Sequence, residues 1–236
     1  MRAHIKEKRE VARDTLMVVF DLLGAEVDYE PGQYFWVTLL DAPYDDEKGV
    51  RRHITAVTSP SEQGVLGLAT RLRDSAFKRS LAELPEGAEV DVEAPKGSFV
   101  LPRESDRPYV FIAGGIGITV FRSMLRYVAD EGLPHRVTLL YSNRDRASTA
   151  FFDELRDLEQ RIPGLDIVFT MTDDAEWEGE TRRIDANFVR DHLADDLGGY
   201  TYLVAGPPGM VDGVTAALAE AGVPDDHVRA DRFSGY

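Results

Sequence analysis

The sequence predicts a two-domain fold, in which an antiparallel β-barrel over residues 1–102 is followed by a parallel α/β domain over residues 108–236. Short apolar or alternating runs, rich in β-branched and aromatic residues and separated by turn-forming residues, indicate antiparallel strands in the first part. Buried strands that alternate with amphipathic helices indicate a parallel sheet covered on both faces in the second part. A charged, proline-flanked linker near residues 102–108 separates the two parts.

The first domain is expected to contain five strands and one short helix. The strand-like runs are residues 15–23, 33–40, 53–59, 65–72 and 88–94. Segments such as "EPGQ", "SPSEQG" and "APKGS" supply the turns between them. Ser75 is placed to cap the one helix, which the helical spacing of Phe77, Leu81 and Leu84 supports.

The second domain is expected to contain five strands and four helices in alternation. The strands are residues 109–113, 136–142, 165–171, 201–205 and 227–233. The helices are residues 120–130, 149–162, 185–197 and 210–222. Gly222 is suited to the end of the last helix, because glycine adopts the left-handed conformation found there.

Composition excludes several classes of function. The chain has no cysteine, which excludes disulfides and cysteine-ligated zinc or iron–sulfur centres within it. A net charge of −15 argues against a nucleic-acid partner, and the histidines lack a metal-binding spacing. No apolar stretch reaches the roughly 20 residues that span a bilayer, and residues 1–14 lack the apolar core of a signal peptide. We therefore expect a cytoplasmic protein without a membrane span or a metal site.

Two glycine-rich loops follow predicted strands of the second domain. The segment "AGGIGIT", residues 113–119, ends the first of these strands, and Gly115 and Gly117 allow the backbone to approach a ligand closely. Alone it fits a tight strand–helix turn equally well, because the full dinucleotide fingerprint has a third glycine. The segment "AGPPGM", residues 205–210, follows the fourth strand. Both loops would lie at the carboxyl edge of one sheet, where nucleotides bind in open α/β folds.

Two basic clusters stand out in the first domain of this acidic chain. Their members are Arg51, Arg52, Arg71, Arg73, Lys78 and Arg79. Hydroxyl side chains lie beside them at Thr55, Thr58 and Ser75, and the second cluster opens the predicted helix. Arginine forks and helix N–H groups together suit a diphosphate. The alternative is a set of surface arginines on the rim of a barrel.

Over nearly its whole length the chain resembles the ferredoxin–NADP(+) reductase superfamily. The similar segments, in family order, are "EPGQYF", "RHITAVTSP", "SAFKRSLAELPEGAEVDVEAPKGSF", "IAGGIGIT" and "AGPPGM". Three positions depart from the family pattern. Ile54 stands where the family has an aromatic residue against the flavin, Val120 replaces a proline, and Ala205 replaces a cysteine near the nicotinamide. Without that cysteine, catalysis would depend mainly on positioning.

The resemblance implies FAD and a nicotinamide dinucleotide as cofactors. The flavin side would comprise Arg52, His53, Ile54, Thr55, Thr70, Arg71, Ser75, Ala76, Phe77 and Lys78. The nicotinamide side would comprise Gly115, Gly117, Ile118, Thr119, Gly206, Pro207, Pro208 and Met210. Thr55, by a hydrogen bond near flavin N5, and Tyr236, by covering the ring, are the expected catalytic residues.

The end of the second strand of the α/β domain bears on the choice of dinucleotide. Ser142, Asn143 and Arg144, with Arg146 nearby, could hold a 2′-phosphate, and no acidic residue directly ends the strand. Residues 182–183, both arginine, could contribute from a neighbouring loop. NADP(H) is therefore favoured over NAD(H). The alternative is that these residues solvate a loop.

The function that the resemblance implies is hydride transfer from NAD(P)H to FAD, with single electrons then passed to a ferredoxin or flavodoxin-like acceptor protein. Two alternatives stay open. The chain could be the reductase component of an oxygenase, or a reductase of free flavin or ferric iron. It could instead be a non-catalytic nucleotide-binding regulatory module, which the departures at Ile54 and Ala205 would favour. Neither the acceptor nor the oligomeric state is indicated by the sequence.

Overall fold

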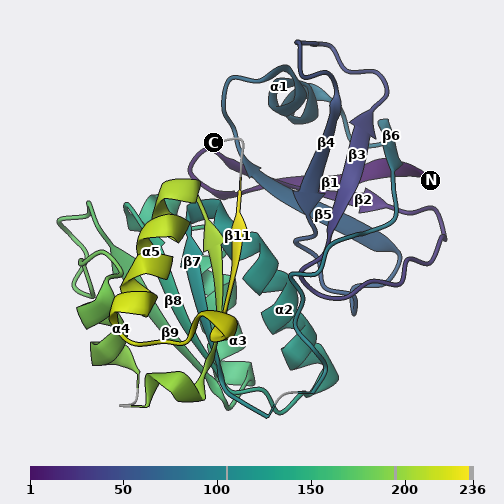
Figure 1. Cartoon of the computed structure of the whole chain (residues 1–236). Helices are drawn as coiled ribbons and strands as arrows, with labels where there is room; N and C mark the ends of the chain where they lie inside the picture. Colours follow the sequence, from purple (N-terminus) through teal and green to yellow (C-terminus); the bar gives the residue numbers. More distant parts are fainter. Residues whose placement is uncertain (105, 194–195, 234–236) are drawn as a thin grey trace.

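An antiparallel six-stranded sheet forms the N-terminal domain of the computed structural model, which describes residues 1–104, 106–193 and 196–233 (Figure 1). Its strands are β1 (Arg2–Ala12), β2 (Thr15–Asp21), β3 (Tyr34–Leu39), β4 (Arg51–Thr55), β5 (Val65–Arg71) and β6 (Glu89–Val92), in the order β4-β3-β6-β1-β2-β5. Beyond the end of β4, the Val57 N–H donates to the Gly67 carbonyl at 2.9 Å and joins the two edges. The predicted antiparallel barrel is confirmed.

Strand β1 is the element that the sequence analysis missed. Its residues are mostly charged, and only Ala3 and Ile5 are buried in the barrel core from its first half. The strand is held by backbone pairing with β2 and β6 on its two sides, and its many charged residues leave little apolar pattern to detect. A second correction concerns residues 53–59, because the strand runs from Arg51 to Thr55 and the carbonyls of Val57 and Thr58 beyond it accept hydrogen bonds from the other domain.

The helix predicted in the barrel domain is confirmed as α1 (Ala76–Glu83). The Ser75 side chain accepts a hydrogen bond from the Lys78 N–H, at 3.3 Å, as an N-cap does. Phe77 and Leu81 are buried against the barrel interior. The helix therefore closes one end of the barrel and presents its N-terminus at the rim.

A five-stranded parallel sheet forms the second domain, as predicted. Its strands are β7 (Tyr109–Gly114), β8 (Val137–Asn143), β9 (Leu165–Met171), β10 (Thr201–Gly206) and β11 (Val228–Arg232), in the order β11-β10-β7-β8-β9. The order reverses between β7 and β10, the two strands that carry the glycine-rich loops. In open α/β sheets such a switch point is where ligands bind.

Helices cover both faces of this sheet (Figure 1). They are α2 (Ile118–Glu131) and α3 (Phe152–Arg161) on one face, and α4 (Ala186–His192) and α5 (Pro208–Glu220) on the other. Helix α4 ends at His192, earlier than predicted, and residues 194–195 lie outside the described part. Helix α3 begins later than predicted because Phe151 has a φ of +59°. Among the described residues, no helix is both long and apolar enough to cross a bilayer.

The two domains share a core and several hydrogen bonds. Met17, Val57 and Ala69 of the barrel pack in the same apolar cluster as the α2 face of the parallel sheet. Main-chain carbonyls accept most of the polar contacts. The Arg71 guanidinium donates to the Ser148 carbonyl at 3.4 Å, and that of Arg229 donates to the carbonyl of Ser98.

Candidate functional site

A cavity of about 580 Å³ lies between the barrel and the parallel sheet. The barrel contributes side chains from β3, β4, β5 and α1. The second domain contributes the loop after β7 and the end of β11. Ten of the predicted site residues line it: Arg52, His53, Ile54, Thr55, Thr70, Arg71, Ser75, Phe77, Lys78 and Thr119. Residues far apart in the sequence are thereby brought together in one site.

The other predicted residues that the structure describes do not line this cavity. Ala76 directs its N–H to the Asp46 carboxylate, at 3.0 Å. The residues of the two glycine-rich loops form the switch point behind Thr119. Tyr236, the predicted ring cover, falls outside the described residues. Phe233 is the last described residue and lines the cavity itself.

The flavin-side wall of the cavity is electropositive. Arg52 Nη1 donates to the carbonyls of Lys48 and Gly49, at 2.6 and 2.8 Å, whereas its Nη2 is buried and makes no hydrogen bond. The pKa of Lys78 is lowered by burial and then by the neighbouring positive charges of Arg73 and Arg52. A buried donor without an acceptor and a destabilised ammonium both favour an anionic ligand.

Asp46 marks where an anion is held at this wall. One carboxylate oxygen accepts the Ala76 N–H at the N-terminus of α1, and the other lies 3.6 Å from Arg52 Nη2. The hydrogen bond from Ala76 is the main reason that the pKa of Asp46 is lowered. The N-terminus of α1 and the Arg52 guanidinium therefore form one anion-binding position. The Asp46 carboxylate occupies it in the way that the anionic group of a ligand would.

Aromatic side chains that the sequence analysis did not assign also line the cavity. Ile54 is half-buried and gives no aromatic surface, but Tyr34 and Trp36 on the neighbouring strand β3 supply one. The His53 ring packs against both, with ring centroids 5.4 Å from Tyr34 and 4.9 Å from Trp36. The signal was present in the sequence, because positions 34 and 36 alternate with the buried core positions of β3.

The two glycine-rich loops meet at the switch point, as predicted. A Cβ on Gly117 would lie 2.3 Å from the Ala205 carbonyl oxygen and 2.8 Å from Gly206 Cα, so only glycine allows this contact. Gly115 has a φ of +52° and packs close to the Arg71 guanidinium. Helices α2 and α5 begin at these loops without a side-chain cap, which leaves N–H groups for an anion.

A second, basic cavity of about 280 Å³ adjoins the end of β8. It is lined by Arg13, Asp14, Arg71, Leu72, Arg73, Arg144 and Ser148. Of the predicted 2′-phosphate residues, only Arg144 lines it. Asn143 is buried, and neither polar atom of its side chain has a hydrogen-bond partner. Ser142 is half-buried.

Two of the other arginines considered for the 2′-phosphate are engaged elsewhere. Arg146 lies over the Phe152 ring and pairs with Asp153 at 2.8 Å. Arg182 pairs with Glu180 and Asp191, at 2.6 and 2.7 Å. Arg183 is exposed and lines neither cavity, so Arg144 is the arginine of this group that lines one of them.

Asp231 is a further cavity residue that the sequence analysis missed. It lies on β11, and burial is the main reason that its pKa is raised above the ordinary value of 3.8. Because the folded state holds this proton more tightly than the unfolded state, Asp231 costs stability as the pH rises above its ordinary pKa.

We therefore expect Asp231→Asn to gain stability relative to the parent as the pH rises, and to lose that advantage in acid. Urea unfolding from pH 4 to pH 8 measures the difference. Asp226→Asn, an exposed acid in the same C-terminal segment, is the control. A difference between Asp231→Asn and the parent that does not change with pH would contradict the raised pKa.

Fold and site together define a class of FAD- and dinucleotide-binding oxidoreductases. The family model of the oxidoreductase FAD-binding domain matches residues 2–101, and that of the oxidoreductase NAD-binding domain matches residues 111–216. The chain belongs to the ferredoxin–NADP(+) reductase superfamily. It carries one FAD-binding and one NAD(P)-binding domain, in the order that the sequence predicted.

The relatives of the chain include reductase components of oxygenases. The chain is 28% identical to the ferredoxin reductase component of 3-ketosteroid-9-alpha-monooxygenase of Mycolicibacterium smegmatis, over 98% of this chain and 64% of the relative. It is 28% identical to the anthranilate 1,2-dioxygenase electron transfer component of Acinetobacter baylyi, over 88% and 59%. The ferredoxin reductase in carbazole 1,9a-dioxygenase superposes with a TM-score of 0.83 at 25% identity, over 99% of this chain and 69% of that one. The chain thus spans less than two thirds of the length of these two curated relatives.

The barrel side fits the FAD that its domain implies. The anion-binding position at Arg52 and the N-terminus of α1 suits a diphosphate. The buried Nη2 of Arg52 makes no hydrogen bond in the protein and can donate to such a ligand. Tyr34 and Trp36 offer flat apolar surface in the same cavity. Positive charge and aromatic surface are the two kinds of contact that such a cofactor requires.

Proposed function

We propose that the chain is an FAD-dependent NADPH oxidoreductase that passes single electrons to a ferredoxin or flavodoxin-like acceptor protein. The observation that supports this most is one cavity lined by the barrel residues Arg52 and Thr55 together with Thr119 of the dinucleotide loop. Two cofactors held in these two domains would meet there. The named relatives, which are reductase components of oxygenases, favour an oxygenase system as the consumer of the electrons.

The side chains of this site would bind the two cofactors and orient them relative to each other. Arg52, Ser75 and Lys78 would hold the diphosphate, with Tyr34 and Trp36 beside the ring system. Bound FAD would supply the conversion of two-electron to one-electron chemistry that the side chains cannot perform. Thr55 is 9% exposed and Thr119 is 1% exposed, so both present their side chains where the protein excludes water.

The uncapped N-termini of α2 and α5 would hold the dinucleotide pyrophosphate. Thr119 is fixed for its role beside the nicotinamide, because its hydroxyl donates to the Ile116 carbonyl at 3.1 Å. That hydrogen bond keeps the side chain at the cavity wall. Positioning, rather than acid–base chemistry, is the contribution expected from this side of the site.

The proposal of NADPH rather than NADH is supported by the basic cavity at the end of β8. Arg144 opens onto it, and Arg71 and Arg73 reach it from the barrel. Arg144→Ala should raise the KM for NADPH by about 10- to 100-fold, the worth of a charge-assisted contact, and change that for NADH less than about twofold. Steady-state reduction of a dye with each dinucleotide measures both. Arg136→Ala, at the amino end of the same strand, is the matched control, and equal effects on both dinucleotides would refute a 2′-phosphate contact.

The proposed function is tested by reconstitution with FAD. The loaded chain should lose its visible flavin absorbance on anaerobic mixing with NADPH, and should then reduce cytochrome c faster when a ferredoxin is added. A chain that binds FAD but is not reduced by either dinucleotide would instead favour the regulatory module. Reduction that no ferredoxin or flavodoxin accelerates would favour a free flavin or ferric reductase.

A further inference from the structure

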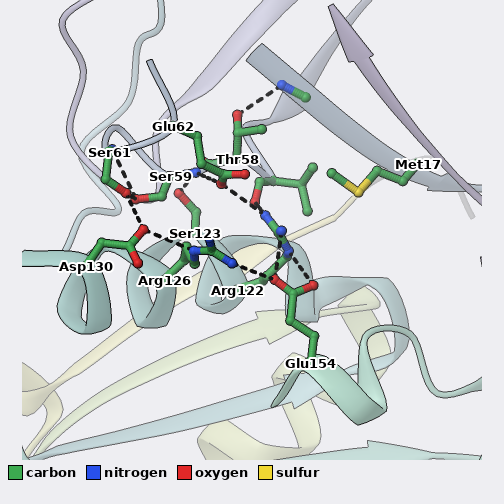
Figure 2. Close-up of polar contacts among 12 residues, drawn as sticks. Met17, Thr58, Ser59, Ser61, Glu62, Arg122, Ser123, Arg126, Asp130 and Glu154 are labelled. Atoms are coloured by element: carbon green, nitrogen blue, oxygen red, sulfur yellow. Dashed lines mark hydrogen bonds and ion pairs between the residues drawn. The ribbon is translucent and has the colours of Figure 1, made fainter. Parts of the chain in front are cut away.

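A buried arginine joins the two domains beside the cavity (Figure 2). Arg122 lies on α2 and is 2% exposed. Its Nη1 donates to the Val57 carbonyl of the barrel domain at 2.5 Å and lies 3.4 Å from Glu62. On its own side, Nε and Nη2 contact the two carboxylate oxygens of Glu154 on α3, at 3.1 and 2.7 Å.

The geometry of these contacts requires a guanidinium. One end of the planar fork donates to one oxygen of Glu154 and forms an ion pair with the other, while the other end crosses the domain boundary. The ammonium of a lysine is a single point charge and could not serve both ends at once. Burying this charge is costly, and the two carboxylates and the carbonyl offset that cost. The position is therefore specified by its two-sided contact rather than by packing alone.

Neighbouring contacts hold the same barrel segment, residues 57–62, against α2 (Figure 2). The Ser123 hydroxyl donates to the Thr58 carbonyl at 2.7 Å, and the Tyr29 hydroxyl donates to that carbonyl from inside the barrel, at 3.0 Å. Farther along α2, Asp130 accepts from the Ser61 hydroxyl at 2.8 Å. The segment is thus fixed at successive points along the helix.

The place of this contact in the chain links it to the site. Val57 is two residues beyond Thr55, and Arg122 is one helical turn beyond Thr119. Thr55 lines the cavity from the barrel domain, and Thr119 lines the same cavity from the α/β domain. The hydrogen bond from Arg122 to the Val57 carbonyl therefore joins the segment that follows Thr55 to the helix that carries Thr119.

We propose that Arg122 is a positioning residue that sets the separation of the two cavity walls, and with it the rate at which electrons leave a bound nicotinamide. The proposal rests on the proposed function for its kinetic consequence only. Its structural consequence, a fixed distance between the domains, holds whatever the chain catalyses. An arginine that merely stabilises the fold would change the midpoint of unfolding but neither of these quantities.

The structural consequence is measured first, on the chain without cofactor. Because the chain has no cysteine, Glu86→Cys in the barrel domain and Asp166→Cys in the α/β domain, both exposed, accept one spin label each. The distribution of distances between the labels should be narrow in the parent and distinctly broader or displaced when Arg122→Lys is added. Arg190→Lys, an exposed arginine confined to the second domain, should leave the distribution unchanged.

The kinetic consequence is measured on the FAD-loaded protein. Arg122→Lys should lower the limiting rate of flavin reduction at saturating NADPH by at least about tenfold, since small misplacements of reacting groups cost up to about a hundredfold. The FAD content and the KM should change less than about twofold. Ser123→Ala deletes one neutral hydroxyl of the same contact and should lower the limiting rate of flavin reduction by about threefold, again with little change in FAD content and KM. Both the distance and the rate can be measured on this variant if Arg122→Lys does not fold.

The outcomes separate the two proposals. Unchanged distances in Arg122→Lys and in Ser123→Ala would overturn the positioning role. If the parent is active, a limiting rate of flavin reduction that is the same in both variants as in the parent would overturn it as well. If the parent itself is not reduced by either dinucleotide, the proposed function fails, and the distance measurement still decides the role of Arg122.

Discussion

Replacing Arg52 by alanine should weaken FAD binding about a hundredfold. Charge-assisted hydrogen bonds contribute about 1.5 to 3 kcal/mol each, and the buried Nη2 of Arg52 makes no hydrogen bond within the protein that would compete with the cofactor. The substitution would also leave the Asp46 carboxylate at the N-terminus of α1 without its countercharge. Titration of the chain stripped of flavin with FAD, followed by flavin fluorescence, measures the dissociation constant.

Two variants make this measurement specific. Arg52→Lys keeps the charge without the fork, and should fall between the parent and alanine, about tenfold weaker than the parent. Arg79→Ala removes an exposed arginine from α1, where it lies over the Tyr44 ring, and should bind FAD as the parent does. Full retention of FAD by Arg52→Ala would contradict the assignment of the diphosphate to this wall.

Gly117→Ala should lower the free energy of unfolding by about 3 kcal/mol. The added Cβ would meet the Ala205 carbonyl oxygen at 2.3 Å and Gly206 Cα at 2.8 Å, and both belong to the backbone of a central strand. Neither can move without disturbing the paired strands β7 and β10, so the cost resembles that of an overpacked core. Urea unfolding followed by circular dichroism measures it.

Gly213→Ala is the matched control for this substitution. Gly213 lies within α5, and a Cβ there would have nothing within 4 Å. Alanine should stabilise the helix by about 0.5 to 1 kcal/mol, because glycine loses more backbone freedom on folding. If Gly117→Ala unfolded as the parent does, the two glycine-rich loops would not be in the contact described.

Local pattern was enough to predict the order of elements and much of the flavin-side wall. The alternation of strands and helices gave all five parallel strands, and the N-cap at Ser75 marked the start of α1. Strand β1 was not predicted because most of its residues are charged. Its charges hid the two that face the core, Ala3 and Ile5.

What could not be predicted depends on how the domains are placed relative to each other. Asp231 enters the cavity from the far edge of the parallel sheet, and no pattern within β11 distinguishes it from a surface acid. Arg122 stands among apolar residues of α2 and pairs with segments that are distant in the sequence. Arg71 was assigned to a diphosphate, yet it also reaches Ser148 of the other domain.

The contact between the domains has an evolutionary consequence. Arg122, Ser123 and Arg71 each donate to a main-chain carbonyl, and every residue type carries that acceptor. The donor positions are therefore constrained, whereas a change of side chain at Val57 or Ser148 leaves the acceptor in place. Paired substitutions are therefore not required to keep these three hydrogen bonds across the boundary. Among homologues, these contacts should thus show constrained donors and little covariation with their acceptors.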